Sequence, residues 1–84
     1  MSQNYPNPFN PITKINFALP NNANVKLVIY DVMGREVVRL VNNEFKQAGR
    51  YTVDFNGQNY ASGVYFYRLE AGDFVQAKKM ILIK

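Results

Sequence analysis

Hydrophobic and polar residues alternate with a period of two along much of this chain, in stretches covering residues 13–19, 25–30 and 49–55. Successive side chains of a β-strand point to opposite faces, so each stretch predicts a strand with one buried face. The inward positions predicted in this way are Ile15, Phe17, Leu19, Val25, Leu27, Ile29, Tyr51, Val53 and Phe55.

Residues 61–69 break the alternation, because apolar and aromatic side chains stand at both odd and even positions after Gly63. This pattern predicts a central strand whose two faces are both at least partly covered. Residues 74–83 form a second apolar run that can pair with the first. Gly72 and Asp73 lie between the two runs and suit a two-residue type II′ turn.

Turn signals separate the remaining strands. Asp31 and Gly34 suit the first and last positions of a type I turn, after which residues 35–41 should return antiparallel. Residues 42–47 fit a loop, a short strand or one helical turn. Asn56-Gly57 predicts a longer loop, because the next strand starts only at Gly63. The whole pattern predicts an all-β fold, a sandwich of about seven antiparallel strands in two sheets.

Residues 4–11 contain three prolines and should be extended or turning, since proline fixes φ and restricts the residue before it. We expect Tyr5 and Phe9 to tuck against the domain, and the alternative is a linker with two stray aromatic residues. The segment also resembles a cut made inside a longer polypeptide. We therefore expect residues 1–11 to be a lead-in from an upstream protein and residues 12–84 to be the domain.

The length allows one small domain, and the net charge bears on the kind of partner it could bind. The chain has 84 residues, no cysteine and a formal net charge of +4. A basic excess suits anionic partners such as nucleic acid or lipopolysaccharide, or simply a solvated surface. The charges are spread along the chain, which favours the surface interpretation. No signal peptide precedes the domain, and no apolar run is long enough for a transmembrane segment.

Candidate chemistry is sparse. The chain has no histidine and no cysteine, which removes the commonest general base, the commonest metal ligand and the thiol nucleophile. Carboxylates could pair for glycoside hydrolysis, but so small a sandwich offers little cleft. We expect no enzyme activity, no cofactor and no metal. The aromatic run before Arg68 is loosely similar to RNA-binding sheets, yet no helices accompany it, and we expect no nucleic acid partner.

A series of motifs nevertheless resembles one family. Its blocks are residues 4–11, 15–20, 25–31 with 34–37, 49–51, 61–65 and 78–84, and their order and spacing are more specific than any single block. Together they resemble the type IX secretion system C-terminal sorting domain, type A, over residues 4–84. The family is also similar to the immunoglobulin-like domain of flagellar hook-capping proteins, but the terminal lysine-flanked block fits sorting domains better. Phe55 stands where a Trp is often seen, which is a conservative departure.

The resemblance implies an immunoglobulin-like sandwich at the C-terminus of a protein exported by certain Gram-negative bacteria. Such a domain would pass through the periplasm with its cargo and be recognised by the outer-membrane translocon. A sortase-like surface peptidase would then remove it, and the cargo would end at the cell surface, sometimes joined to lipopolysaccharide. The implied partners are therefore the translocon, the peptidase and the cargo in the same polypeptide.

The last strand is the expected recognition signal for export. Its apolar run ends at the terminus and is flanked by lysines, which could simply guard the edge against aggregation. The more specific hypothesis is that a receptor adds a strand to this edge and binds the lysine ammonium groups with its own carboxylates. The expected recognition residues are Lys78, Lys79, Met80, Ile81, Leu82, Ile83 and Lys84.

Other residues are expected to shape the domain, and we expect Gly63→Val to harm export by damaging the fold. The structural and motif positions are Asn7, Pro8, Asp31, Gly34, Gly49, Gly63, Tyr65 and Gly72, of which Asn7 and Pro8 should fix the junction with the cargo. The competing hypothesis is a passive carbohydrate-binding or adhesion module. Its contact residues would be exposed Tyr5, Tyr60 or Tyr67, arranged in a planar row.

Overall fold

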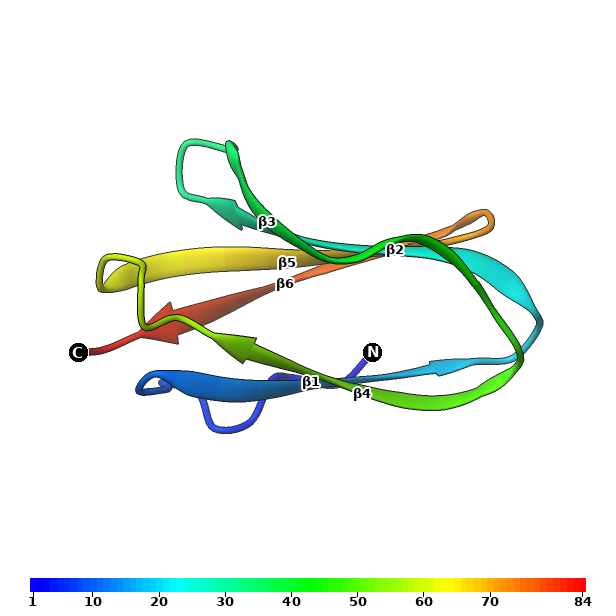
Figure 1. Cartoon of the computed structure of the whole chain (residues 1–84), viewed down its shortest axis with the longest axis horizontal. Helices are drawn as coiled ribbons and strands as arrows, with labels where there is room; N and C mark the ends of the chain where they lie inside the picture. Colours follow the sequence, from blue (N-terminus) through cyan, green and yellow to red (C-terminus); the bar gives the residue numbers. More distant parts are fainter.

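The computed structural model describes residues 1–84 and contains six β-strands and no helix (Figure 1). The fold class is therefore the predicted one. The strands are β1 (Ile12–Leu19), β2 (Ala23–Asp31), β3 (Glu36–Lys46), β4 (Gly49–Asn56), β5 (Gly63–Ala71) and β6 (Phe74–Leu82).

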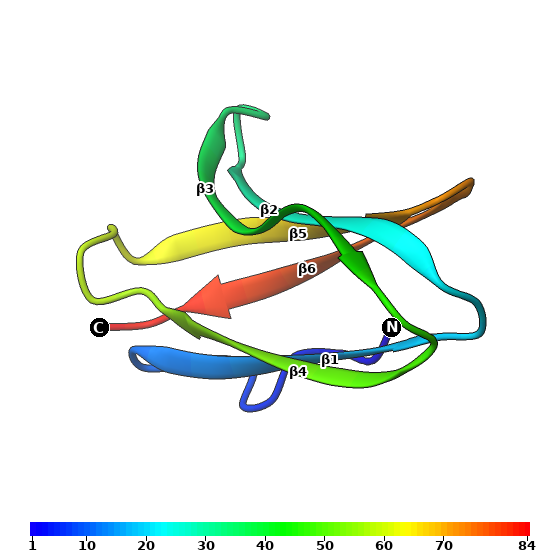
Figure 2. The same cartoon turned by 45° about the vertical axis from the view of Figure 1, so that its right-hand side comes forward.

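The strands form two antiparallel sheets that face each other. One sheet pairs β1 with β4, and the other has the order β3-β2-β5-β6. Figures 1 and 2 show the small sheet below the large one, with the chain passing from one sheet to the other at the ends. This is the sandwich-like arrangement that the alternating pattern predicts.

The alternation places the core as expected. In β1, Ile15, Phe17 and Leu19 are buried, while the residues between them are exposed. Val25, Leu27 and Ile29 of β2 are fully buried and face the same core. No buried side-chain nitrogen or oxygen lacks a hydrogen-bond partner, so the interior has no uncompensated polar group.

The expected seventh strand is absent as a separate element. Residues 42–46, which the sequence left open, continue β3 to Lys46. The register explains the ambiguity, because Val25 pairs with Glu44 but Leu27 pairs with Val41, so Asn42 and Asn43 oppose one residue of β2. Asn43 takes a φ of 53° there. This β-bulge breaks the local alternation that would otherwise have identified one long strand.

Strand β5 is central, as predicted, with β2 on one side and β6 on the other. Its two faces are covered unequally, within the at least partial cover that was predicted. Tyr65, Tyr67 and Leu69 are buried between the sheets, but Phe66 on the other face is 37% exposed. The small sheet does not cover this outer face, where charged neighbours such as Arg68 lie beside Phe66, although Val28 of β2 is buried on the same face at 1% exposed.

The segment before β1 packs on both sheets. Ser2 N–H donates to Asn16 C=O at 3.0 Å, and Tyr5 and Lys14 exchange two backbone hydrogen bonds. Phe9 then pairs in parallel with the end of β6. Phe9 is 1% exposed, which confirms that it tucks into the domain, whereas Tyr5 is 77% exposed and does not. The boundary expected at residue 11 stays a prediction.

Candidate functional site

Strand β6 is an edge strand of the large sheet, and its side chains divide the predicted recognition residues into two sets. Met80 and Leu82 point between the sheets and are 0% and 1% exposed. Lys79 and Ile83 are exposed, and Ile81 is half-buried. Because side chains alternate along a strand, the same segment both fills the core and offers groups to solvent.

The backbone edge of β6 is partly occupied by the N-terminal segment, residues 2–9, which we call the N-terminal clasp. Phe9 N–H donates to Ile81 C=O at 2.9 Å, and Ile83 N–H donates to Phe9 C=O at 2.9 Å. The side-chain oxygen of Asn7 accepts from Ile81 N–H at 2.9 Å. The Gln3 side-chain amide donates to Lys79 C=O at 2.8 Å. The clasp therefore closes the edge from the Lys79 carbonyl to Ile83.

The first half of the same edge is open. At the edge of an antiparallel sheet, every second residue directs its N–H and C=O away from the neighbouring strand. In β6 these are the odd-numbered residues, since Ile81 is one of them. Val75, Ala77 and the Lys79 N–H thus face outward, and no hydrogen bond engages them. Phe74 and Val75 are half exposed at the start of this stretch. We call residues 75–79 the open edge.

A buried polar network holds the upstream part of the clasp. The Tyr67 hydroxyl donates to Ser2 C=O at 3.0 Å and accepts from Asn4 N–H at 2.8 Å. The Asn4 side-chain amide donates to Thr13 Oγ1 at 3.0 Å, and that hydroxyl donates to Pro6 C=O at 2.8 Å. Burial raises the pKa of Tyr67, because the charged phenolate would lose its hydration.

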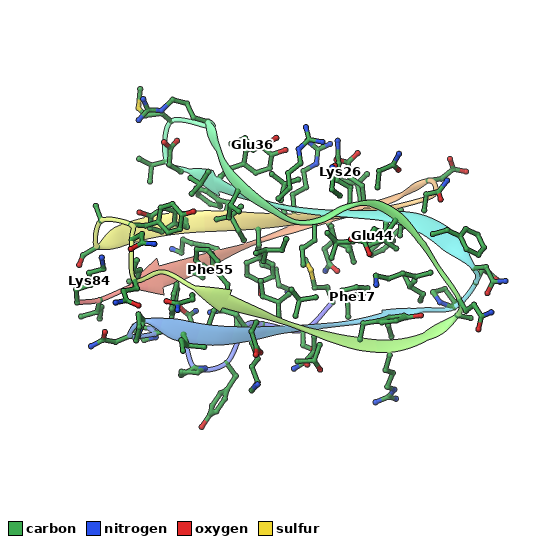
Figure 3. The ribbon with its side chains drawn as sticks, in the orientation of Figure 1. Phe17, Lys26, Glu36, Glu44, Phe55 and Lys84 are labelled. Atoms are coloured by element: carbon green, nitrogen blue, oxygen red, sulfur yellow. The ribbon has the colours of Figure 1, made fainter.

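An aromatic cluster holds the downstream part. The Phe9 ring lies edge-on to Phe55 at 5.9 Å between centroids, and Tyr60 stacks on the other side of Phe55 at 5.8 Å. Figure 3 shows Phe55 in the space between the two sheets. A Cβ on Gly57 would lie 2.9 Å from a Leu82 methyl carbon and 3.3 Å from the Phe9 ring. Gly57 therefore permits close packing, a role that the Asn56-Gly57 turn signal did not reveal.

The lysines around β6 differ in their surroundings. Neither Lys78 nor Lys79 forms an ion pair with a carboxylate, and they lie on opposite faces of the strand. Lys84, at the tip of the sandwich in Figure 3, donates from its ammonium to Gln58 C=O at 2.6 Å and from its N–H to Ser62 Oγ at 3.1 Å. The two free ammonium groups of Lys78 and Lys79 thus flank the open edge.

The predicted turn at Asp31 is confirmed but lies two strands away from β6. Gly34 N–H donates to Asp31 C=O, and the Asp31 carboxylate accepts from the N–H groups of Met33 at 2.9 Å and Arg35 at 3.0 Å. The bond from the Arg35 backbone N–H is the main reason why the pKa of Asp31 is lowered. Gly34 has a φ of 79°, a conformation that favours glycine. This turn shapes the β2–β3 hairpin and contributes nothing to the edge.

The remaining motif positions are structural in their placement. Ala71 pairs with Phe74 across Gly72, whose φ of 60° suits the predicted type II′ turn. Tyr65 is buried opposite Met80 and donates to Ala61 C=O at 2.6 Å. Gly49 begins β4 and Gly63 begins β5. A Cβ on Gly63 would meet no atom within 4 Å, so the harm expected from Gly63→Val would come from the backbone at the start of the strand.

The aromatic residues do not form the row that a carbohydrate-binding surface would need. Tyr67 is fully buried, and Tyr60 is half-buried against Phe55. Tyr5 is exposed on the clasp without an aromatic neighbour from this set. The competing hypothesis therefore lacks its contact surface.

Most of the carboxylates lie beside a cation. Each of the carboxylates Asp31, Glu36, Glu44, Asp54 and Glu70 lies within 4.0 Å of a lysine or arginine nitrogen. No group of three acidic, histidine or cysteine residues is placed to hold a metal ion. The structure also contains no helix with the length and apolar character to cross a membrane.

These features define a class of small β-sandwich whose last strand is an edge strand of the larger sheet, open along its first half. The model of the family described as the secretion system C-terminal sorting domain matches residues 3–84. The chain therefore belongs to that family and is a sorting signal of the type IX secretion system. No curated protein and no solved structure matches the chain. Its function is to direct a protein across the outer membrane to the cell surface or the outside.

Proposed function

We propose that the outer-membrane translocon recognises this domain through β6, by adding a strand to the open edge at residues 75–79. The observation that carries the proposal is the unpaired backbone of Val75 and Ala77 and the unpaired N–H of Lys79, beside ammonium groups without ion-pair partners. An added strand would bond to these N–H and C=O groups, which gives affinity without demanding a particular sequence.

Charge would supply the selectivity. Lys78 and Lys79 project from opposite faces of β6, so a receptor strand with carboxylates on both sides would engage both ammonium groups. Two of the expected recognition residues, Met80 and Leu82, would then serve the fold because they are buried in the core. The residues that a receptor could reach are Lys78, Lys79, Ile81, Ile83 and Lys84.

Charge reversal tests this proposal better than deletion. Removing residues 80–84 would also remove Met80 and Leu82 from the core. We expect Lys79→Glu to lower surface delivery of a fused cargo by about tenfold, because a negative group would face the receptor carboxylates. The matched control is Arg50→Glu, which reverses another exposed cation that has no ion pair, on the opposite sheet.

Thermal unfolding of both variants must accompany the delivery assay. The proposal requires that Lys79→Glu and Arg50→Glu unfold at similar temperatures while only the first loses delivery. Equal delivery by the two folded variants would refute recognition through the lysines of β6.

The domain itself performs no reaction in this proposal. It passes through the periplasm with its cargo, and a sortase-like surface peptidase removes it afterwards. Asn7 is bonded to Ile81, which supports a role in holding the junction rather than in being cut. Mass spectrometry of the released cargo and domain tests this role, and a cut between Asn7 and Pro8 would contradict it.

A further inference from the structure

The loop at residues 6–11 is anchored near β1 at one end and just after β4 at the other, while its middle reaches across to β6. Before the loop, Tyr5 pairs with Lys14 of β1, and at its last residue Pro11 C=O accepts from Gly57 N–H at 2.8 Å. Between these anchors the loop touches the β6 backbone through three hydrogen bonds, one from the Asn7 side chain and two from the Phe9 backbone. Lifting the loop from β6 with its ends in place would break these three bonds and withdraw the Phe9 ring, which is 1% exposed, from the core.

Lifting the loop would leave a defined slot. The slot would present the N–H and C=O of Ile81 and the N–H of Ile83, all now bonded to the loop. Beside them would open the space of the Phe9 ring, bounded by Phe55, Gly57 and Leu82. The slot also continues the open edge, so the outward backbone groups from Val75 to Ile83 would be free except the Lys79 C=O, which Gln3 still bonds.

The present occupant shows what the slot accepts. An oxygen acceptor on the side chain of residue 7 meets Ile81 N–H, and an aromatic ring two residues later fills the apolar space. The occupant runs parallel to β6, since the bridge between Phe9 and Leu82 is parallel. The Phe9 ring lies so near Gly57 that a Cβ there would be 3.3 Å from it, and it meets the Phe55 ring edge-on, so an aromatic ring suits this space.

We propose that this slot is an exchangeable strand-receptor site. The loop swings out, and an extended segment of a partner protein binds parallel to β6 with an amide or carboxylate oxygen at the place of Asn7 and an aromatic ring at the place of Phe9. The proposal rests on β6 being the recognition strand, and it adds that the domain masks half of this strand until a partner displaces its own loop. Strand exchange of this kind would reuse the backbone groups that the loop now engages and would refill the core space of the Phe9 ring.

The first test measures whether the loop opens on its own, using the full 84-residue chain and its Asn7→Ala variant. Asn7 is exposed, so the variant removes one hydrogen bond without disturbing the core. The control is Asn10→Ala, in the same loop, whose side chain makes no hydrogen bond to the protein. We expect amide exchange at Ile81 and Ile83 to quicken about tenfold in Asn7→Ala only, with exchange at Ile29 in β2 unchanged.

The second test measures occupancy of the slot with a fluorescent peptide that carries residues 4–11 of this sequence. The peptide brings the Asn7 oxygen that the variant lacks, so we expect it to bind Asn7→Ala about tenfold more tightly than the unmodified chain. The same peptide with Phe9→Ala should lose most of this binding.

Several results would overturn the proposal. Exchange at Ile81 and Ile83 as slow as at Ile29 would mean that the loop leaves only on global unfolding. Rapid exchange without peptide binding would mean that the slot is not a receptor. A dimer in sedimentation would assign the slot to a second copy of the chain instead of another protein. Because no export is measured here, this inference can fail while the effect of Lys79→Glu on delivery stands.

Discussion

The two halves of β6 have the same neighbour, β5, yet they serve the molecule differently. In the second half, Met80 and Leu82 are buried in the core, and the clasp occupies the outer backbone groups. In the first half, Val75 is 51% exposed, and the outer backbone groups have no partner. The second half of β6 thus stabilises the fold, whereas the first half exposes unpaired backbone groups at the sheet edge.

This difference shows why the terminal block should not be treated as one recognition motif. Its apolar residues point inward and would stabilise the fold whether or not a receptor exists. Its lysines and its open backbone lie where an approaching strand would meet them. If the translocon binds β6 as proposed, the domain must fold before it is recognised.

The largest expected effect is a difference in the free energy of unfolding between substitutions in the two halves of β6. We expect Leu82→Ala to lower the free energy of unfolding by about 2–5 kcal/mol, since it leaves a cavity between Phe9 and Gly57. Val75→Ala should change the same quantity by less than about 0.5 kcal/mol, because the side chain is half exposed. Urea denaturation measures both, and similar losses would erase the distinction between the halves.

A smaller effect should come from the hydroxyl that holds the clasp. Tyr67→Phe removes the group that bonds to Ser2 and Asn4 and leaves the Asn4 N–H buried without a partner. We expect a loss of about 1–3 kcal/mol in urea denaturation. The control is Tyr5→Phe, at an exposed site, which should be neutral. A neutral Tyr67→Phe would show that the clasp does not depend on this network.

The smallest effect should appear at high pH. Burial raises the pKa of Tyr67 and of Tyr65 above the ordinary value of 10.0. The unfolded chain therefore loses these protons first, so this stabilisation is complete below about pH 10 and is lost as the pH rises through the folded pKa values. The urea concentration at the unfolding midpoint should fall as the pH rises above about 10. The fall should be smaller in Tyr67→Phe, which lacks one of the two hydroxyls. A midpoint independent of pH would contradict the burial of these hydroxyls.

The strand pattern was predictable because alternation and turn chemistry are local. Ile15 and Phe17 lie inward as the period of two requires, and Gly72 turns the chain where a two-residue turn needs a positive φ. The bulge at Asn43 was not predictable, since it depends on a register shift against β2. The unequal cover of the two faces of β5 was not predictable either, because an apolar strand does not reveal how many layers lie over each face.

The candidate site was predictable only in part. The lysines and the apolar run of β6 stand next to one another in the sequence, so they drew attention as a block. The clasp joins Asn7 to Ile81 across more than seventy positions, and backbone pairing over such a distance leaves no local pattern. Gly57 carried a turn signal that hid its packing against Leu82.

The central claim is that the open edge of β6 is the surface that the export machinery recognises. Ala77→Pro tests it most directly, because the ring removes an outward N–H that bonds to nothing in the domain, and edge strands tolerate proline at such positions. Surface delivery of a fused cargo should be lost while the purified domain still unfolds cooperatively at nearly the same temperature. Normal delivery by a folded Ala77→Pro domain would contradict the claim.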